Sequence, residues 1–287
     1  MLLQGPLSSC QDGFARFGGL MVDKYTFPPP DPSVQSDDRI ITDGLRVRVY
    51  MPKGYSGGSP VGVYFHGGGW AMGDLDGDDA FARSISKGGN VVVVSVEYGL
   101  APQNKHPGLI NDCYKGLQWT LEHAKELGGT EGRVFTAGVS AGAGLALGVA
   151  LKAIDEGLED SLVGVVALVP ATVHPKACPD AFKSKYTSYK EHDQHTINTA
   201  SAMETFWGES SWTRELLAYS SLTSTDSLGA PPTDPYASPL LHPRVKHLKK
   251  VYLAVAGHDT LRDDGLLFKR KLDDEGYDMN LQYMLYR

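Results

Sequence analysis

Short, β-rich apolar runs that alternate with helix-like stretches are the feature of this chain that most limits its fold. Val61 to Phe65 and Val91 to Val96 are almost wholly apolar, as strands buried on both faces of a parallel sheet are. Helical patterns follow these runs at residues 79–87 and 109–127. Repeated alternation of this kind predicts an α/β fold, with a mostly parallel sheet and helices on both of its faces.

The same alternation continues through the second half of the chain. Leu162 to Val169, Val251 to Ala256 and Met279 to Tyr286 are further predicted strands. A helix is expected from about Arg262 to Glu275, and Gly276 would end it because glycine readily adopts the left-handed conformation of a helix C-terminus.

The predicted sheet has an N-terminal arm before it. Residues 1–40 contain several prolines between positions 28 and 32, which lack backbone donors and break regular structure. Leu45 to Tyr50 then alternates apolar and polar side chains, which predicts a half-buried edge strand.

A polar segment interrupts the strand–helix rhythm at residues 172–234 and ends in a proline-rich stretch. We interpret it as a helical cap inserted over the carboxyl ends of the strands, where ligands bind in open α/β sheets. Residues 41–171 and 235–287 would then form the core.

Composition and charge limit the cellular setting and the partners. The chain has 287 residues with a net charge of -7, which argues against nucleic acid or anionic membranes as partners. No apolar stretch is long enough to span a membrane, and residues 1–10 lack the pattern of a secretory signal. Cys10, Cys113 and Cys178 are odd in number and far apart, which favours a reducing compartment and a cytoplasmic location.

The segment Gly138-Val139-Ser140-Ala141-Gly142 has the form of a nucleophile elbow. It follows the strand-like residues 133–137 and leads into a helix of small residues. A serine on such a sharp turn projects its hydroxyl clear of the sheet, and the flanking glycines leave room for the turn. Ser140 is therefore the candidate nucleophile; the alternative is a small residue in a glycine-rich turn.

The segment His66-Gly67-Gly68-Gly69-Trp70 offers backbone donors for an oxyanion. We expect these donors to be the N–H groups of Gly67 and Gly68, with the N–H of Ala141 at the start of a helix. His66 would hold this loop by hydrogen bonds. Because no Gly-Lys-Ser/Thr sequence follows the glycines, a phosphate-binding P-loop is excluded.

A serine nucleophile needs a general base and an acid that orients the base. Asp259 follows the strand that ends at Ala256, where the acid is expected. Asp263 and Asp264 are weaker candidates, since we expect them in the first turn of the next helix, where its dipole favours carboxylates. None of the nine histidines in the chain suits the role of the base.

Three other patterns are rejected. A dinucleotide fingerprint that would begin at Gly142 fails at Leu147. A calcium loop that would begin at Asp74 has Asp79 in the place of its glycine. His192 and His195 have zinc-like spacing but no companion ligands, so we interpret them as solvated cap residues and predict no metal site.

Four large side chains are candidates to line an acyl pocket: Trp70, Met72, Phe206 and Trp207. For Phe206 and Trp207, ordinary packing of the cap is the competing interpretation.

Over residues 40–287 the chain resembles the hormone-sensitive-lipase-like branch of the α/β-hydrolases, and within that family it is most similar to fungal esterases. The segments that carry the resemblance are His66–Trp70, Glu97–Gln103, Gly138–Gly142, Asp234–Leu240 and Asp259–Asp263. Two residues depart from the family pattern: Gly99 and Gln103 stand where arginine and glutamate are usual, which would alter loop support rather than chemistry.

The resemblance implies an α/β-hydrolase fold and a carboxylic ester hydrolase that acts on short or medium acyl esters or aromatic acetates. It implies Ser140 as nucleophile, Asp259 as acid, a cap built from the arm and the insertion, and no cofactor. The family histidine would fall just beyond Arg287. Relatives are often homodimers. Two alternatives stay open: a catalytically impaired small-molecule-binding protein, like the gibberellin receptor, and a lyase or cyclase.

Overall fold

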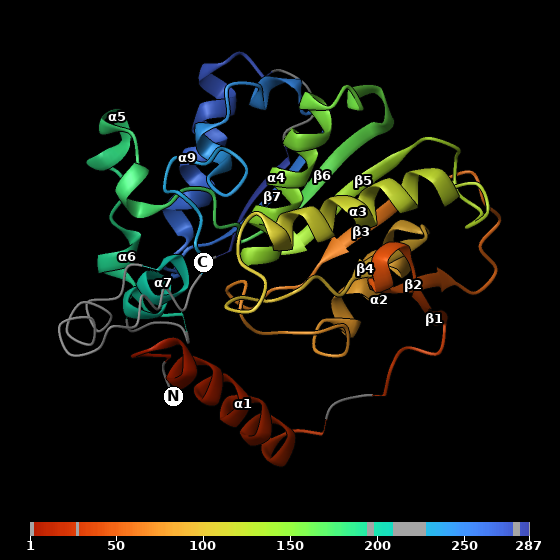
Figure 1. The fold of residues 1–287 in the computed structure, drawn as a ribbon, viewed down its shortest axis with the longest axis horizontal. Coiled ribbons are helices and arrows are strands. Elements are labelled where there is room, and N and C mark those ends of the chain that lie inside the picture. The colour runs from red at the N-terminus through yellow and green to blue at the C-terminus, as the bar shows by residue number, and fades with distance from the viewer. Residues whose placement is uncertain (1–2, 27–28, 194–197, 209–227, 278–281, 287) are drawn as a thin grey trace.

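An eight-stranded sheet forms the centre of the computed structural model, which describes residues 3–26, 29–193, 198–208, 228–277 and 282–286 (Figure 1). The strands lie in the order β1-β2-β4-β3-β5-β6-β7-β8, and only the pairs β1–β2 and β2–β4 are antiparallel. The strands are β1 (Val34–Ile40), β2 (Arg46–Pro52), β3 (Val61–Phe65), β4 (Val93–Val96), β5 (Val134–Val139), β6 (Leu162–Leu168), β7 (Val251–Ala256) and β8 (Gln282–Tyr286). The predicted mostly parallel α/β sheet is confirmed.

The helices of the core follow the predicted strand–helix alternation. They are α2 (Asp79–Gly89), α3 (Gly108–His123), α4 (Ala141–Asp155) and α9 (Arg262–Asp274). Gly276 adopts a φ of 72° just after α9, as expected of a residue that ends a helix.

The strand β1 was not predicted, and its presence corrects the interpretation of β2 as an edge strand. β1 pairs with β2 over Val34 to Ile40, so β2 lies inside the sheet. Six of the seven β1 residues are exposed, so its side chains carry no apolar alternation. Backbone pairing holds this strand, and such pairing leaves no pattern in the sequence.

Successive residues of the central strand β3 point to opposite faces of the sheet and join different apolar clusters. Val63 belongs to the larger cluster, which includes Leu117 of α3 and Leu147 of α4. Tyr64 belongs to the smaller cluster, which includes Ala82 of α2. Helices therefore cover both faces, as predicted from the apolar runs.

Among the described residues between β6 and β7, in the segment predicted to be a cap, the α-helices are α5 (Asp180–Lys183), α6 (Ser188–Glu191) and α7 (Ala200–Trp207). The N-terminal helix α1 (Leu7–Lys24) lies beside α7 at one margin of the molecule (Figure 1). The hydroxyls of Thr199 and Thr205 donate to the carbonyls of Leu3 and Gly5 at 2.6 and 2.8 Å. These contacts join the N-terminal arm to the inserted segment, the two parts of the chain that were expected to form a cap.

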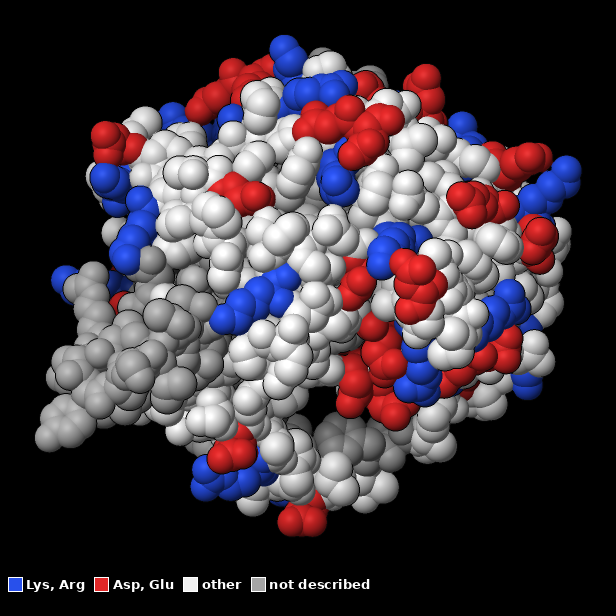
Figure 2. Space-filling view, viewed as in Figure 1, with Lys and Arg blue, Asp and Glu red and all other residues white. Residues whose placement is uncertain are grey.

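Acidic and basic side chains are interspersed over the face of the molecule in Figure 2. Within the described ranges, no helix combines the length and the apolar character needed to cross a membrane. In the same ranges, no group of three or more histidine, cysteine or carboxylate side chains is arranged to hold a metal ion.

Candidate active site

Ser140 occupies a strained turn between β5 and α4. Its φ and ψ are 55° and -122°, a conformation that few residues with a side chain adopt. Its backbone N–H donates to the carbonyl of Leu168 on the neighbouring strand at 2.8 Å. The structure thus has the strand, turn and helix that the elbow motif predicts around this serine.

Gly138 and Gly142 flank Ser140 at positions where other backbone segments leave no room for a side chain. A Cβ atom on Gly138 would collide with the backbone of Gly142. A Cβ atom on Gly142 would collide with the carbonyls of Phe65 and His66, at the end of β3. The elbow therefore packs directly on the start of the glycine loop, by which we mean Gly67, Gly68 and Gly69.

Gly67 itself lies next to the serine. A Cβ atom built on Gly67 would stand 3.7 Å from the Cβ of Ser140. Two motifs that are far apart in the sequence are therefore neighbours in space, as acyl chemistry requires.

The peptide planes beside Ser140 are fixed through their carbonyls. The Ser140 carbonyl accepts hydrogen bonds from Ala143 and Gly144 at 3.0 and 3.1 Å. The Gly68 carbonyl accepts from Ala71 and Met72 at 3.1 and 3.0 Å. In a trans peptide the N–H points opposite to the C=O, so these bonds orient the N–H groups of Ala141 and Gly69 away from the backbone that holds them.

His66 fixes the peptide plane between Gly67 and Gly68. Its Nδ1 lies 2.7 Å from the Gly67 carbonyl, so Nδ1 carries the proton and donates it, which in turn orients the N–H of Gly68. The His66 ring stacks on Tyr98 at 4.3 Å, and burial lowers the pKa of this histidine, so the ring is neutral. This geometry is what we expected of a histidine that holds the loop.

The structure differs from the expected set of oxyanion donors at Gly67. The Gly67 N–H already donates to Asp78 Oδ2 at 3.0 Å. Within the part of the chain that the structure describes, the N–H groups of Gly68, Gly69 and Ala141 donate no hydrogen bond. Gly69 therefore replaces Gly67 among the candidate donors.

Asp259 lies in the turn after β7, as predicted. Its Oδ1 accepts the Leu261 N–H at 2.8 Å and the Thr260 hydroxyl at 3.3 Å. Burial raises the pKa of Asp259, and these two hydrogen bonds oppose the shift.

Asp263 and Asp264 bind backbone of the predicted cap segment, unlike Asp259. Both lie in the first turn of α9, as predicted. Asp263 Oδ2 accepts the N–H groups of Thr187 and Ser188 at 2.6 and 2.7 Å, which attaches the segment around α6 to α9. Both oxygens of Asp263 and of Asp264 accept hydrogen bonds from other parts of the fold. The described hydrogen bonds of Asp259 all reach Oδ1, which favours Asp259 as the acid of the site.

The described histidines, which are all but His195, have no hydrogen bond to the Ser140 hydroxyl. His192 is buried rather than solvated, which corrects our interpretation of it as a surface residue. It is 7% exposed, and its Nε2 accepts a hydrogen bond from Arg262 at 2.7 Å. This contact was not foreseeable from the spacing of His192 and His195, and His195 lies outside the described residues.

The four candidate pocket residues are buried around the glycine loop. The ring of Trp70 lies 4.5 Å from that of Trp207 on α7. The ring of Phe206 covers Gly69 so closely that a Cβ atom there would stand 2.7 Å from it. Met72 donates its N–H to the Gly68 carbonyl. Phe206 thus packs on the glycine loop, and Trp207 packs on Trp70, the residue that follows that loop.

Reasoning from the sequence missed three residues that shape this site. Asp78 belongs to the aspartate-rich stretch that we rejected as a calcium loop. Tyr98 lies in one of the segments that carry the family resemblance, and its hydroxyl donates to the His66 carbonyl at 2.8 Å. Gly69 stands in the glycine motif itself, where only the direction of each peptide decides which N–H is available.

A family model that covers most of the chain identifies its family. Residues 62–285 match the model of the α/β hydrolase fold family. The chain therefore belongs to the α/β-hydrolases, in the hormone-sensitive-lipase-like branch that its motifs indicated.

Three known proteins illustrate the relationship. A versiconal hemiacetal acetate esterase from Aspergillus parasiticus is 41% identical over 267 residues, which are 93% of this chain and 77% of that protein. A thermostable esterase from Pseudomonas putida has a similar crystal structure, with a TM-score of 0.76 and 28% identity over 96% of this chain and 79% of that one. Vibralactone cyclase has a TM-score of 0.77 and 26% identity over 98% of this chain and 80% of that one.

Proposed function

We propose that this protein is a carboxylic ester hydrolase that uses Ser140 as its nucleophile and forms an acyl-enzyme. The observation that carries the proposal is the set of three backbone N–H groups beside Ser140, those of Gly68, Gly69 and Ala141, whose directions are fixed and which have no acceptor among the described residues. The similarity of this chain to esterases supports the same activity.

This geometry supports the following reaction. The Ser140 hydroxyl attacks the ester carbonyl, and the three N–H groups stabilise the oxygen that becomes negative. The serine proton passes to a general base, for which the family resemblance implies a histidine that Asp259 would orient. The alcohol leaves, and water then releases the acid from Ser140.

The cap is part of the proposal. We infer that α1, α5, α6 and α7 form a lid-like layer over the site, since α7 places Phe206 on Gly69 and Trp207 on Trp70. These aromatic rings and Trp70 suit an aromatic or medium-length acyl ester, because apolar burial and ring stacking stabilise such groups.

The test uses p-nitrophenyl acetate and a fluorophosphonate probe. The wild-type protein is expected to hydrolyse the ester and to be labelled on Ser140, and Ser140→Ala should lose both. Turnover that survives unchanged in Ser140→Ala refutes the proposal. Tight binding of small esters to a wild-type protein that the probe does not label would instead favour a binding protein.

A second candidate is a cyclase, which the likeness to vibralactone cyclase favours. An acyl-enzyme on Ser140 would then be attacked by a hydroxyl of the same acyl group instead of by water, giving a lactone. Product analysis with a hydroxyacyl ester distinguishes the two, since hydrolysis gives the free hydroxy acid.

A further inference from the structure

We propose that Asp78 is a positioning residue for the oxyanion site: its carboxylate sets the orientation of the glycine loop and thereby of the N–H groups of Gly68 and Gly69. The inference rests on the proposed function. Asp78 touches neither Ser140 nor any atom assigned to the reaction, so it would act through the loop.

Asp78 and Tyr98 hold one peptide plane from its two sides. The plane between His66 and Gly67 donates its N–H to Asp78 Oδ2 at 3.0 Å. The carbonyl of the same plane accepts the Tyr98 hydroxyl at 2.8 Å. A plane that is bonded at both ends cannot rotate without losing a bond, so the loop leaves β3 in one direction.

The carboxylate of Asp78 is itself held in place. Its Oδ2 also accepts the hydroxyl of Tyr64 at 2.8 Å. Tyr64 is buried in β3, the strand that leads into the glycine loop. The bond to a charged oxygen is stronger than one between neutral groups, and both donors of Asp78 belong to the strand–loop junction.

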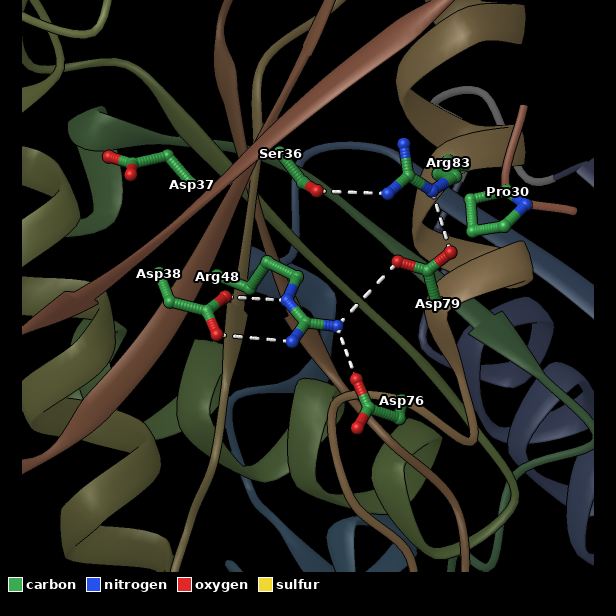
Figure 3. Close-up of a pocket in the computed structure, with 8 residues that line it drawn as sticks. All are labelled: Pro30, Ser36, Asp37, Asp38, Arg48, Asp76, Asp79 and Arg83. Carbon is green, nitrogen blue, oxygen red and sulfur yellow. Dashed lines mark hydrogen bonds and ion pairs between the residues drawn. The ribbon is translucent and has the colours of Figure 1, made fainter. Parts of the chain in front are cut away.

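The segment that carries Asp78 is attached to the antiparallel margin of the sheet. Asp74 Oδ1 accepts the N–H groups of Asp76 and Gly77 at 3.0 and 2.7 Å and shapes the turn before Asp78. Figure 3 shows the Arg48 side chain between Asp38 on one side and Asp76 and Asp79 on the other. Arg48 contacts Asp76 at 2.7 Å and Asp79 at 3.7 Å, on both sides of Asp78 in the sequence.

These contacts give a structural reason for the aspartate-rich stretch that we rejected as a calcium loop. Asp76 and Asp79 attach the turn to β2 through Arg48, and Asp78 between them points to the glycine loop. Each carboxylate has its own basic or N–H partner in the fold, so the stretch serves the geometry of the oxyanion site.

The first experiment compares Asp78→Ala, Asp78→Asn and the control Asp37→Ala, with active sites counted by fluorophosphonate labelling. Asp37 lies on the same margin and pairs with Arg39, so its replacement removes a similar charge away from the loop. Asp78→Ala should lower kcat per labelled site by about 10–100-fold with KM little changed, since misplacing one oxyanion donor costs up to about 10²–10³. Affinity for a phenylboronic acid, which forms a tetrahedral anion on serine, should fall by a similar factor. Asp78→Asn keeps an acceptor oxygen and should recover most of the loss.

A second readout does not depend on activity. Amide hydrogen exchange of residues 66–73 should become faster in Asp78→Ala and stay near the wild-type rate in Asp37→Ala. If Asp78→Ala fails to fold, Tyr64→Phe removes one anchor of the carboxylate and should give a smaller change in the same direction.

The outcomes separate this inference from the proposed function. If kcat per labelled site and boronate affinity are unchanged in Asp78→Ala while Ser140→Ala is inactive, the function stands and the positioning role is wrong. If Ser140→Ala keeps full turnover, the function is wrong, and exchange of residues 66–73 still tests the role of Asp78. Unchanged exchange overturns that role in either case.

Discussion

Asp264 Oδ1 accepts the backbone N–H of Thr172 at 2.8 Å, although 92 positions separate the two residues. The same oxygen accepts the N–H of Val173, and the hydroxyl of Tyr186 donates to Oδ2. This fully buried carboxylate therefore attaches the beginning of the cap segment to the first turn of α9.

The stability of the protein should depend on pH through Asp264. Burial raises its pKa to about 7 in the folded protein, against roughly 3.9 in an unfolded chain. The folded state thus holds the proton more tightly, so this contribution is complete below about pH 4 and is lost as the pH rises toward 7. The wild type should lose about 1.4 kcal/mol per pH unit between roughly pH 5 and 7 relative to Asp264→Asn.

Urea unfolding of both proteins from pH 5 to 8 measures this difference. The comparison with Asp264→Asn cancels the titration of all other groups. Parallel stability curves over that range would show that Asp264 titrates normally.

Gly142→Ala should damage the elbow, because the added methyl group would meet the carbonyls of Phe65 and His66. We expect a loss of roughly 1–3 kcal/mol in the free energy of unfolding and weaker labelling of Ser140. Gly88→Ala is the matched control: it lies in α2 with no atom within 4 Å of the new methyl group. That variant should gain about 0.5–1 kcal/mol and keep its activity. Equal stability of the two variants in urea would contradict the close approach at Gly142.

Tyr98→Phe should reduce activity without creating a cavity in the core. The ring stacked on His66 remains, and only the hydroxyl that donates to the His66 carbonyl is lost. The buried carbonyl then lacks one donor, and we expect kcat per labelled site to fall about tenfold, which corresponds to ~1.4 kcal/mol. Steady-state kinetics with p-nitrophenyl acetate provides the measurement, and a wild-type kcat would mean that the hydroxyl does not constrain the loop.

Asp259→Asn and Asp263→Asn should separate catalysis from support. Asp259→Asn should lower kcat by about 10³–10⁴-fold if this carboxylate orients the base. Asp263→Asn weakens the bonds to Thr187, Ser188 and Arg262, so we expect a loss of about 1.5–3 kcal/mol in stability and little change in kcat per labelled site. Kinetics and urea unfolding of both variants test the assignment, and the opposite pattern would exchange the two roles.

The order of strands and helices was predictable because each buried strand is a short apolar run. β7 begins and ends at Val251 and Ala256 as predicted, and the core helices differ from prediction only at their ends. β1 was not predictable, since its side chains are exposed and its place depends on backbone bonds to β2.

The sequence by itself determined the elbow and the glycine loop, because a sharp turn and a close approach of backbone admit only glycine at a few positions. Which N–H groups of that loop are available was decided by tertiary structure alone. The N–H of Gly67 already donates to Asp78. The hydrogen bond from His66 to the Gly67 carbonyl orients the N–H of Gly68. The bonds from Ala71 and Met72 to the Gly68 carbonyl orient the N–H of Gly69. Peptide direction depends on partners that are distant in the chain, and a motif does not record them.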